Sequence, residues 1–120
     1  LLGISGFSAD MRVLLASDEE QAASAVAFYC YRISRELGSL AAALGGLDAL
    51  VFTGGIGENA APVRARILQS SSWLGLELDE GANEKSQTRI TYGKSNTHAW
   101  VVPTDEELSI ARHTLRVLGR

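Results

Sequence analysis

Residues 49–59 read Ala49-Leu50-Val51-Phe52-Thr53-Gly54-Gly55-Ile56-Gly57-Glu58-Asn59, and this stretch decides the fold that we predict. Its first four residues are apolar and favour a buried β-strand, whereas the glycines that follow interrupt a regular strand. Residues 60–68 then favour a helix, which Asn59 can cap and in which Pro62 falls in the first turn. The stretch predicts a strand, a glycine turn and a helix, which is an α/β arrangement.

A glycine turn in this position can bring the backbone close to a phosphate or a nucleotide. Glycine has no Cβ atom to block the approach, and a helix N-terminus offers unpaired N–H groups and a positive dipole end. The alternative is a tight turn that binds nothing, and the cluster alone does not separate the two. Two known templates are excluded: Glu58 and Asn59 replace the Lys and Ser/Thr of a P-loop, and the spacing is not G-x-G-x-x-G.

Composition narrows the function classes. The length of 120 residues suits one domain, and 46% apolar with 21% charged residues is typical of a globular protein. A net charge of −3 and a pI near 5.3 argue against a nucleic-acid surface, and no apolar run is long enough to span a membrane. Cys30 is the only cysteine, so an internal disulfide is excluded and a reducing, cytoplasmic compartment fits. We see no signal peptide, and because the chain opens on Leu1 rather than Met, we expect it to be a piece of a longer protein.

Before the central stretch we predict a loop and a long helix. Residues 2–12 are rich in Gly and Ser and predict an ordered loop, with Asp10 and Arg12 on a short turn as a solvated ion pair or as a ligand contact. Ser17 to Glu20 form a capping box, and Gly45-Gly46 ends the helix. Apolar residues spaced by three or four predict its buried face: Ala22, Val26, Tyr29, Ile33, Leu37, Leu40 and Leu44. So long a helix, flanked by alanines, predicts contact with a second subunit or with the rest of the chain.

After the central stretch we predict a helix to about residue 70 and a short edge strand over 73–78. Residues 79–97 are polar, and within them only 88–91 favours a strand. A further strand is predicted over 98–102, and Pro103 ends it. His98 receives no role, because no other metal-ligating residue stands at a suitable spacing from it. Thr104 to Glu107 form a second capping box, before a last helix. The acids at this helix start either offset the dipole or, through one carboxylate, face a magnesium ion beside phosphates.

Three segments together resemble one family. Residues 2–12, 43–59 and 102–112 are similar, in order and spacing, to the C-terminal domain of the acetate kinase family, which also includes propionate and butyrate kinases. The resemblance covers nearly the whole chain, 1–120, as a nucleotide-binding and dimerisation domain. Asp105 is a departure, because the family usually has Asn there.

The resemblance implies a fold and a site. The fold is a ribonuclease-H-like domain of the actin-like ATPase superfamily, with a mixed sheet, flanking helices and one long helix. The reaction is reversible phosphoryl transfer from ATP to acetate, giving ADP and acetyl phosphate, with Mg²⁺ as cofactor and Glu106 as the magnesium-site glutamate. The nucleotide-contacting residues implied are Asp10, Met11, Arg12, Gly54, Gly55, Ile56, Gly57, Glu58 and Asn59.

The resemblance also implies what these residues lack. The family's acetate pocket, catalytic arginines, catalytic aspartate and phosphate-loop asparagine would lie upstream of Leu1, so we expect no catalytic residue here and no turnover by this chain alone. We expect a homodimer that acts on small molecules. Two alternatives stay open: a non-catalytic nucleotide-binding or dimerisation module, and a sugar or glycerol kinase of the same superfamily, against which residues 103–107 argue.

Overall fold

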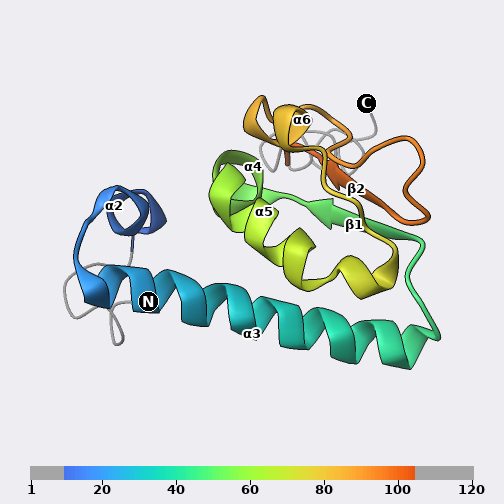
Figure 1. The fold of residues 1–120 in the computed structure, drawn as a ribbon, viewed down its shortest axis with the longest axis horizontal. Helices are drawn as coiled ribbons and strands as arrows, with labels where there is room; N and C mark the ends of the chain where they lie inside the picture. Colours follow the sequence, from blue (N-terminus) through green and yellow to red (C-terminus); the bar gives the residue numbers. More distant parts are fainter. Residues whose placement is uncertain (1–9, 105–120) are drawn as a thin grey trace, which may run out of the picture.

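The computed structural model describes residues 10–104, in which helices surround a small parallel sheet (Figure 1). In chain order, the elements are α2 (Met11–Ala16), α3 (Glu20–Leu44), β1 (Ala49–Phe52), α4 (Gly54–Asn59), α5 (Ala61–Ser70), the 3₁₀ helix η1 (Ser72–Leu74), α6 (Glu80–Glu84) and β2 (His98–Val101). The predicted last helix and the acids at its start lie outside the described residues.

The two strands pair in parallel. Ala49 lies opposite His98, and the register continues to Phe52 opposite Val101. A parallel pair needs a long crossover connection, and residues 53–97 with three α-helices provide it. The strands predicted over 73–78 and 88–91 are not formed as such, because residues of these segments make only isolated bridges, such as Leu78 with Thr91. Within the described part, both named strands run the same way, and antiparallel pairing occurs only as isolated bridges, among them one between Arg89 and Trp100 of β2.

The long helix is confirmed as α3, with 25 residues, and it ends at Gly45 in a left-handed conformation. Its predicted cap is wrong. Glu19 is extended at φ −68° and ψ 138°, so the helix starts at Glu20 rather than after Ser17. Ser17 instead ends α2, and its Oγ accepts a hydrogen bond from the Glu19 N–H at 3.1 Å. The predicted loop over residues 2–12 also ends in a helix: Asp10 is the N-cap of α2, and Met11 and Arg12 lie in its first turn.

The glycine cluster is a short helix rather than a turn. Thr53 is extended, and α4 begins directly at Gly54, whose φ of 76° permits the sharp change of direction. We predicted that Asn59 caps the next helix, and this prediction is wrong. Asn59 ends α4, its Nδ2 donates to the Gly55 carbonyl at 2.9 Å, and Ala60 occupies the cap position of α5. Pro62 does fall at the start of α5.

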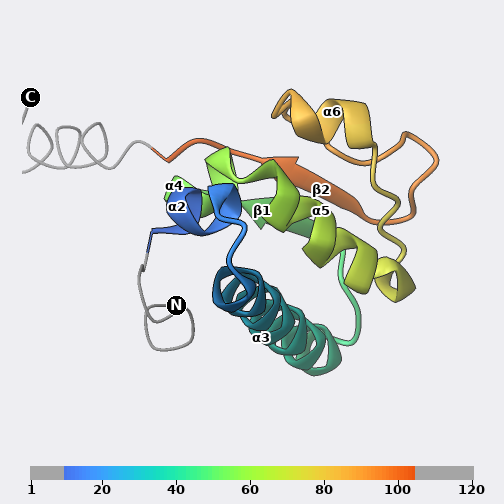
Figure 2. The ribbon, with the colours of Figure 1, turned by 60° about the vertical axis from the view of Figure 1, so that its left-hand side comes forward.

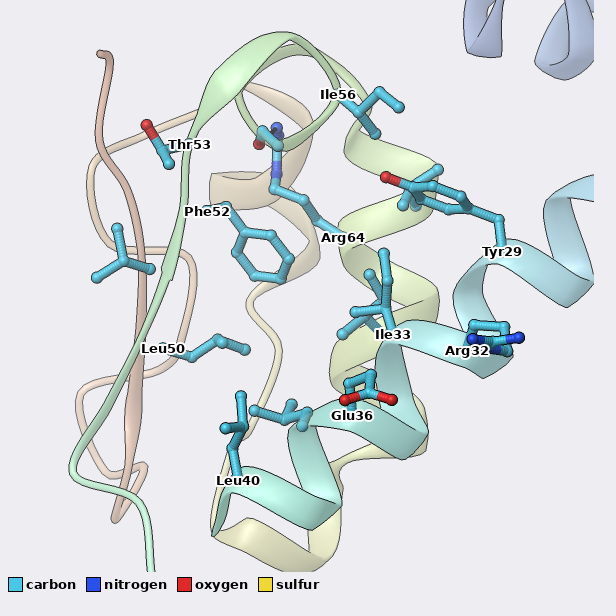
Figure 3. Close-up of a pocket in the computed structure, with 15 residues that line it drawn as sticks. Tyr29, Arg32, Ile33, Glu36, Leu40, Leu50, Phe52, Thr53, Ile56 and Arg64 are labelled. Carbon is cyan, nitrogen blue, oxygen red and sulfur yellow. Dashed lines mark hydrogen bonds between the residues drawn. The ribbon is translucent and has the colours of Figure 1, made fainter. Parts of the chain in front are cut away.

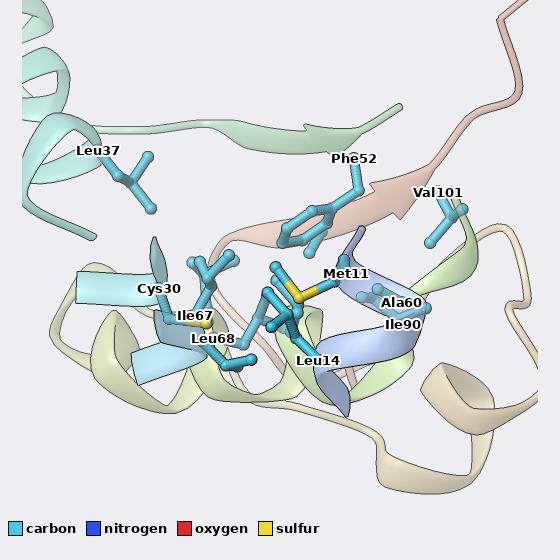
Figure 4. Packing of buried hydrophobic residues seen from close by; sticks show 14 of the residues in the cluster. Met11, Leu14, Cys30, Leu37, Phe52, Ala60, Ile67, Leu68, Ile90 and Val101 are labelled. Carbon is cyan, nitrogen blue, oxygen red and sulfur yellow. The ribbon is translucent and has the colours of Figure 1, made fainter. Parts of the chain in front are cut away.

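The helices cover the sheet from two sides. α3 lies along one side of α5 and the sheet, and α6 lies on the opposite side (Figure 2). Buried apolar side chains from α2, α3, α5 and the strands form one core, with Met11, Leu14, Cys30, Phe52 and Ile67 among them (Figure 4). No described helix is both long and apolar enough to cross a membrane.

The predicted buried face of α3 holds for only part of its length. Ala22, Val26 and Leu37 are buried, whereas Leu40 and Leu44 are 58% and 74% exposed. The helix therefore extends beyond the core that the described residues build. β1, predicted as a buried strand, is likewise buried only at Phe52, and Val51 is 53% exposed.

The polar stretch after residue 79 contains a helix that we did not predict. Asp79 caps α6, because its Oδ1 accepts from the Ala82 N–H at 3.1 Å. The pair Asp79-Glu80 is a helix-start signal that could have indicated this element.

Candidate functional site

α2 and α4 form the two walls of a groove of about 730 Å³. Asp10, Met11, Arg12 and Leu15 line one wall; Gly55, Ile56, Asn59 and Ala60 line the other. The structure thus brings together two of the segments that we selected from the sequence, although some forty residues separate them along the chain. Among the predicted site residues, Gly54, Gly57 and Glu58 do not line this groove.

The wall at α2 is organised by Asp10. Its Oδ1 accepts from the Arg12 backbone N–H at 2.9 Å, and its Oδ2 lies 3.0 Å from Arg12 Nη2, so the predicted ion pair is present. The Arg12 side-chain hydrogen bond is the main cause that lowers the pKa of Asp10, and the same contact raises the pKa of Arg12. The Arg12 side chain remains 88% exposed, whereas Met11 is 4% exposed and anchors α2 in the core. Arg12 is therefore the charged group that this wall offers to a ligand.

The wall at α4 is open at Gly55 and closed at Gly57. A Cβ atom placed on Gly55 would meet nothing within 4 Å. A Cβ on Gly57 would lie 3.2 Å from the carbonyl carbon of Phe52, so α4 packs directly against the end of β1. Gly55 leaves space in the groove, and Gly57 allows the close approach that fixes α4.

Arg64 on α5 is the residue that sequence reasoning missed. Its side chain is fully buried, and burial lowers the pKa of its guanidinium. Nη1 donates to the carbonyls of Gly57 and Glu58, both at 3.0 Å, and Nε donates to Asn83 Oδ1 at 2.7 Å. A signal did exist in the sequence: an arginine at position 64 shares a helix face with the apolar Ala60, Ile67 and Leu68.

Glu58 points away from the groove and toward the end of the described chain. Its Oε2 accepts from Thr104 Oγ1 at 3.3 Å and lies 3.5 Å from the Thr104 nitrogen. The segment that contains Glu106 therefore begins beside α4, although Glu106 itself lies outside the described residues. Between residues 10 and 104, no group of three or more His, Cys, Asp or Glu side chains could hold a metal ion.

A second cavity of about 480 Å³ lies between α3, β1 and α5 (Figure 3). Its lining is largely apolar and includes Ile33, Leu50 and Phe52, with Arg32 and Glu36 from α3. Ile56 lines this cavity as well as the groove, so α4 separates the two spaces. His98 belongs to neither: its Nδ1 lies 2.8 Å from Thr91 Oγ1, and this hydrogen bond joins β2 to the polar stretch.

Comparison with known proteins identifies the relatives of this arrangement. The model of the acetokinase family matches residues 1–112. The chain is 57% identical over 119 residues to an acetate kinase of Rhodopseudomonas palustris, covering 98% of this chain and 30% of that protein. It is 55% identical over 119 residues to an acetate kinase of Rhizobium meliloti, covering 99% of this chain and again 30% of the relative. The chain thus spans about 30% of the length of the curated relatives it matches.

Solved structures of acetate and propionate kinases also resemble this chain. A crystal structure of Porphyromonas gingivalis acetate kinase matches with a TM-score of 0.88 and 39% identity, over 98% of this chain and 31% of that one. A propionate kinase of Francisella tularensis matches with a TM-score of 0.83 and 38% identity, over 92% of this chain and 29% of that one.

Proposed function

The chain belongs to the acetokinase family, and from that premise we propose that it is the nucleotide-binding part of an acetate kinase. The whole protein would transfer the γ-phosphoryl group of ATP reversibly to acetate, giving ADP and acetyl phosphate. The single observation that carries the assignment to this part of the protein is the groove between α2 and α4, which joins the two segments expected to contact nucleotide.

The groove has the chemistry that a nucleotide needs. Arg12 supplies an exposed guanidinium that Asp10 orients, and a guanidinium matches the geometry of a phosphate. Leu15 and Ile56 supply apolar surface for a base, and Gly55 leaves the backbone of α4 accessible. Gly54, Gly57 and Glu58 act indirectly in this proposal, by shaping α4.

Magnesium belongs to the proposal through Glu106. The contact between Thr104 and Glu58 supports it, because the acidic segment then starts beside the helix that borders the groove. Magnesium is commonly held by one or two carboxylates together with phosphates and water, so one protein acid is sufficient. In the whole enzyme, Glu106→Ala should raise the magnesium requirement and Glu107→Ala should not; the reverse result would contradict the assignment.

The proposal also covers the fold, the assembly state and the cellular compartment of the protein. We propose an actin-like ATPase fold of ribonuclease-H type, of which residues 1–120 form a C-terminal nucleotide-binding and dimerisation domain, and a cytoplasmic homodimer. Propionate is the second candidate acceptor, because a propionate kinase shares the fold of this chain at 38% identity. A non-catalytic nucleotide-binding module is the alternative from another class.

One experiment separates these functions. The matching 119 residues of the Rhodopseudomonas palustris acetate kinase are replaced by this chain, which gives a chimaeric kinase. We expect the chimaeric kinase to form acetyl phosphate from ATP and acetate, with acetate preferred to propionate and butyrate. A folded chimaera that binds ATP and forms no acyl phosphate would favour the non-catalytic module.

A further inference from the structure

We propose that Arg64 is a positioning residue for nucleotide binding, which holds α4 in the place where its outer face forms the groove. The inference rests on the proposed function, because it assigns Arg64 a role in the same nucleotide site. Arg64 itself does not line the groove, so it would act only through α4.

The contacts of Arg64 join three helices. From α5, its Nη1 reaches the carbonyls of Gly57 and Glu58 at the end of α4. Its Nη2 donates to the Asn83 carbonyl of α6 at 2.7 Å and to Ser86 Oγ at 2.9 Å. Asn83 is held in turn, because its Nδ2 donates to the Ala61 carbonyl at 2.9 Å. Each guanidinium nitrogen therefore has a partner, which a buried charge requires.

The carbonyls of Gly57 and Glu58 lie in the last turn of α4, where no N–H of the same helix is available to donate to them. The last carbonyls of a helix have no intrahelical donor, and here a buried guanidinium supplies one. α4 also rests on β1, where Gly57 allows contact with Phe52, and Phe52, Gly57 and Arg64 all line the second cavity. Arg64 and Phe52 thus fix α4 from within the protein, while Gly55, Ile56 and Asn59 face the groove. A shift of α4 would move all the groove residues on that wall together.

This arrangement gives the segment from Asp79 to Ser86 a function that its sequence did not suggest. No residue of α6 lines the groove, yet Asn83 of α6 and Ser86 just after it accept the hydrogen bonds that Arg64 donates on this side. The segment is therefore a buttress that supports α4 through Arg64.

The test uses the chimaeric kinase with Arg64→Lys. Lysine keeps the charge but loses the planar fork of donors that reaches two helices at once. Because a displacement of about 1 Å in a binding site can cost as much as a hundredfold, we expect KM for ATP to rise by about tenfold or more, with kcat at saturating ATP much less affected. Asn83→Ala, which removes the side-chain partner of Arg64 Nε, should raise KM for ATP in the same direction. Arg66→Lys is the matched control, since Arg66 stands on the same helix and is exposed, and it should leave KM unchanged.

The outcomes are distinct. If Arg64→Lys and Asn83→Ala lower the melting temperature but leave KM for ATP unchanged, Arg64 is a stabilising residue only and the inference is overturned. If Arg64→Lys does not fold, Ser86→Ala carries the same test, because it removes one hydroxyl partner of Nη2 and should still raise KM severalfold. If the unsubstituted chimaeric kinase binds no ATP, the proposed nucleotide site fails, and the inference fails with it.

Discussion

Gly54, Gly55 and Gly57 stand in one short helix, but a side chain would have a different effect at each position. Gly54 has φ of 76°, a conformation that other residues adopt only at a cost of roughly 1–2 kcal/mol. Gly57 has the backbone of Phe52 against it, and Gly55 has open space. The sequence predicted a role for these glycines together, but their separate roles depend on the path of the backbone, which the sequence does not show.

We expect Gly55→Val in the chimaeric kinase to weaken ATP binding by about tenfold or more, which is a loss of at least about 1.4 kcal/mol. The valine side chain meets no protein atom near its Cβ, so the fold should persist while the groove is obstructed. Calorimetry measures the affinity, and thermal unfolding checks the fold.

Gly57→Val is the control for that variant. Its Cβ would lie 3.2 Å from a backbone atom that cannot move aside easily, so the variant should lose about 1–3 kcal/mol of stability. Unchanged ATP affinity in a folded Gly55→Val variant would show that nucleotide does not approach α4 at this point.

Among the elements, those with strong local signals were predicted and those shaped by packing were not. α3, β1, α5 and β2 follow from apolar periodicity and from glycine or proline at their ends. α4 was missed because glycine has a poor intrinsic helix propensity. Here Arg64, Phe52 and the Asn59 side chain stabilise it, and these contacts exist only in the folded chain.

α3 carries the prediction at this scale. On the side away from the core, Phe28 and Tyr31 are 45% and 58% exposed and stand three residues apart on one helix face. We expect the chain to self-associate through this face, because large exposed apolar side chains on one element favour an interface. Sedimentation should show a dimer at micromolar concentration, and Phe28→Glu should shift it toward monomer. Tyr92→Glu, at an exposed position outside α3, should not; a monomer at high micromolar concentration would contradict the prediction.

At the scale of the whole molecule, the sequence indicated part of the groove's lining but not its shape: six of the nine residues predicted to contact nucleotide line the groove, whereas Leu15 and Ala60 line it without having been predicted. The resemblance placed residues 10–12 and 54–59 at one nucleotide, and the structure supplies the reason that they can meet: α2 folds back over α3 and brings Asp10 beside α4. The buttress over residues 79–86 was not predictable, because its contribution depends on a buried arginine more than fifteen residues away along the chain.

The last prediction concerns the 120 residues as an isolated chain. Phosphoryl transfer requires donor, acceptor and cation to be held together, because catalysis works through positioning and charge stabilisation. Among the residues that line the groove, Arg12 supplies the exposed cation, and the described residues contain no cluster of His, Cys, Asp or Glu able to hold a metal. We therefore expect the isolated chain to bind ADP weakly, in the high micromolar range or above, and to form no acetyl phosphate from ATP, Mg²⁺ and acetate. Calorimetry measures the binding and a hydroxamate assay measures the product, with the chimaeric kinase as the positive control. Turnover by the isolated chain that Gly55→Val abolishes would show that these residues also hold the acceptor, and the assignment of this chain to the nucleotide side alone would then be wrong.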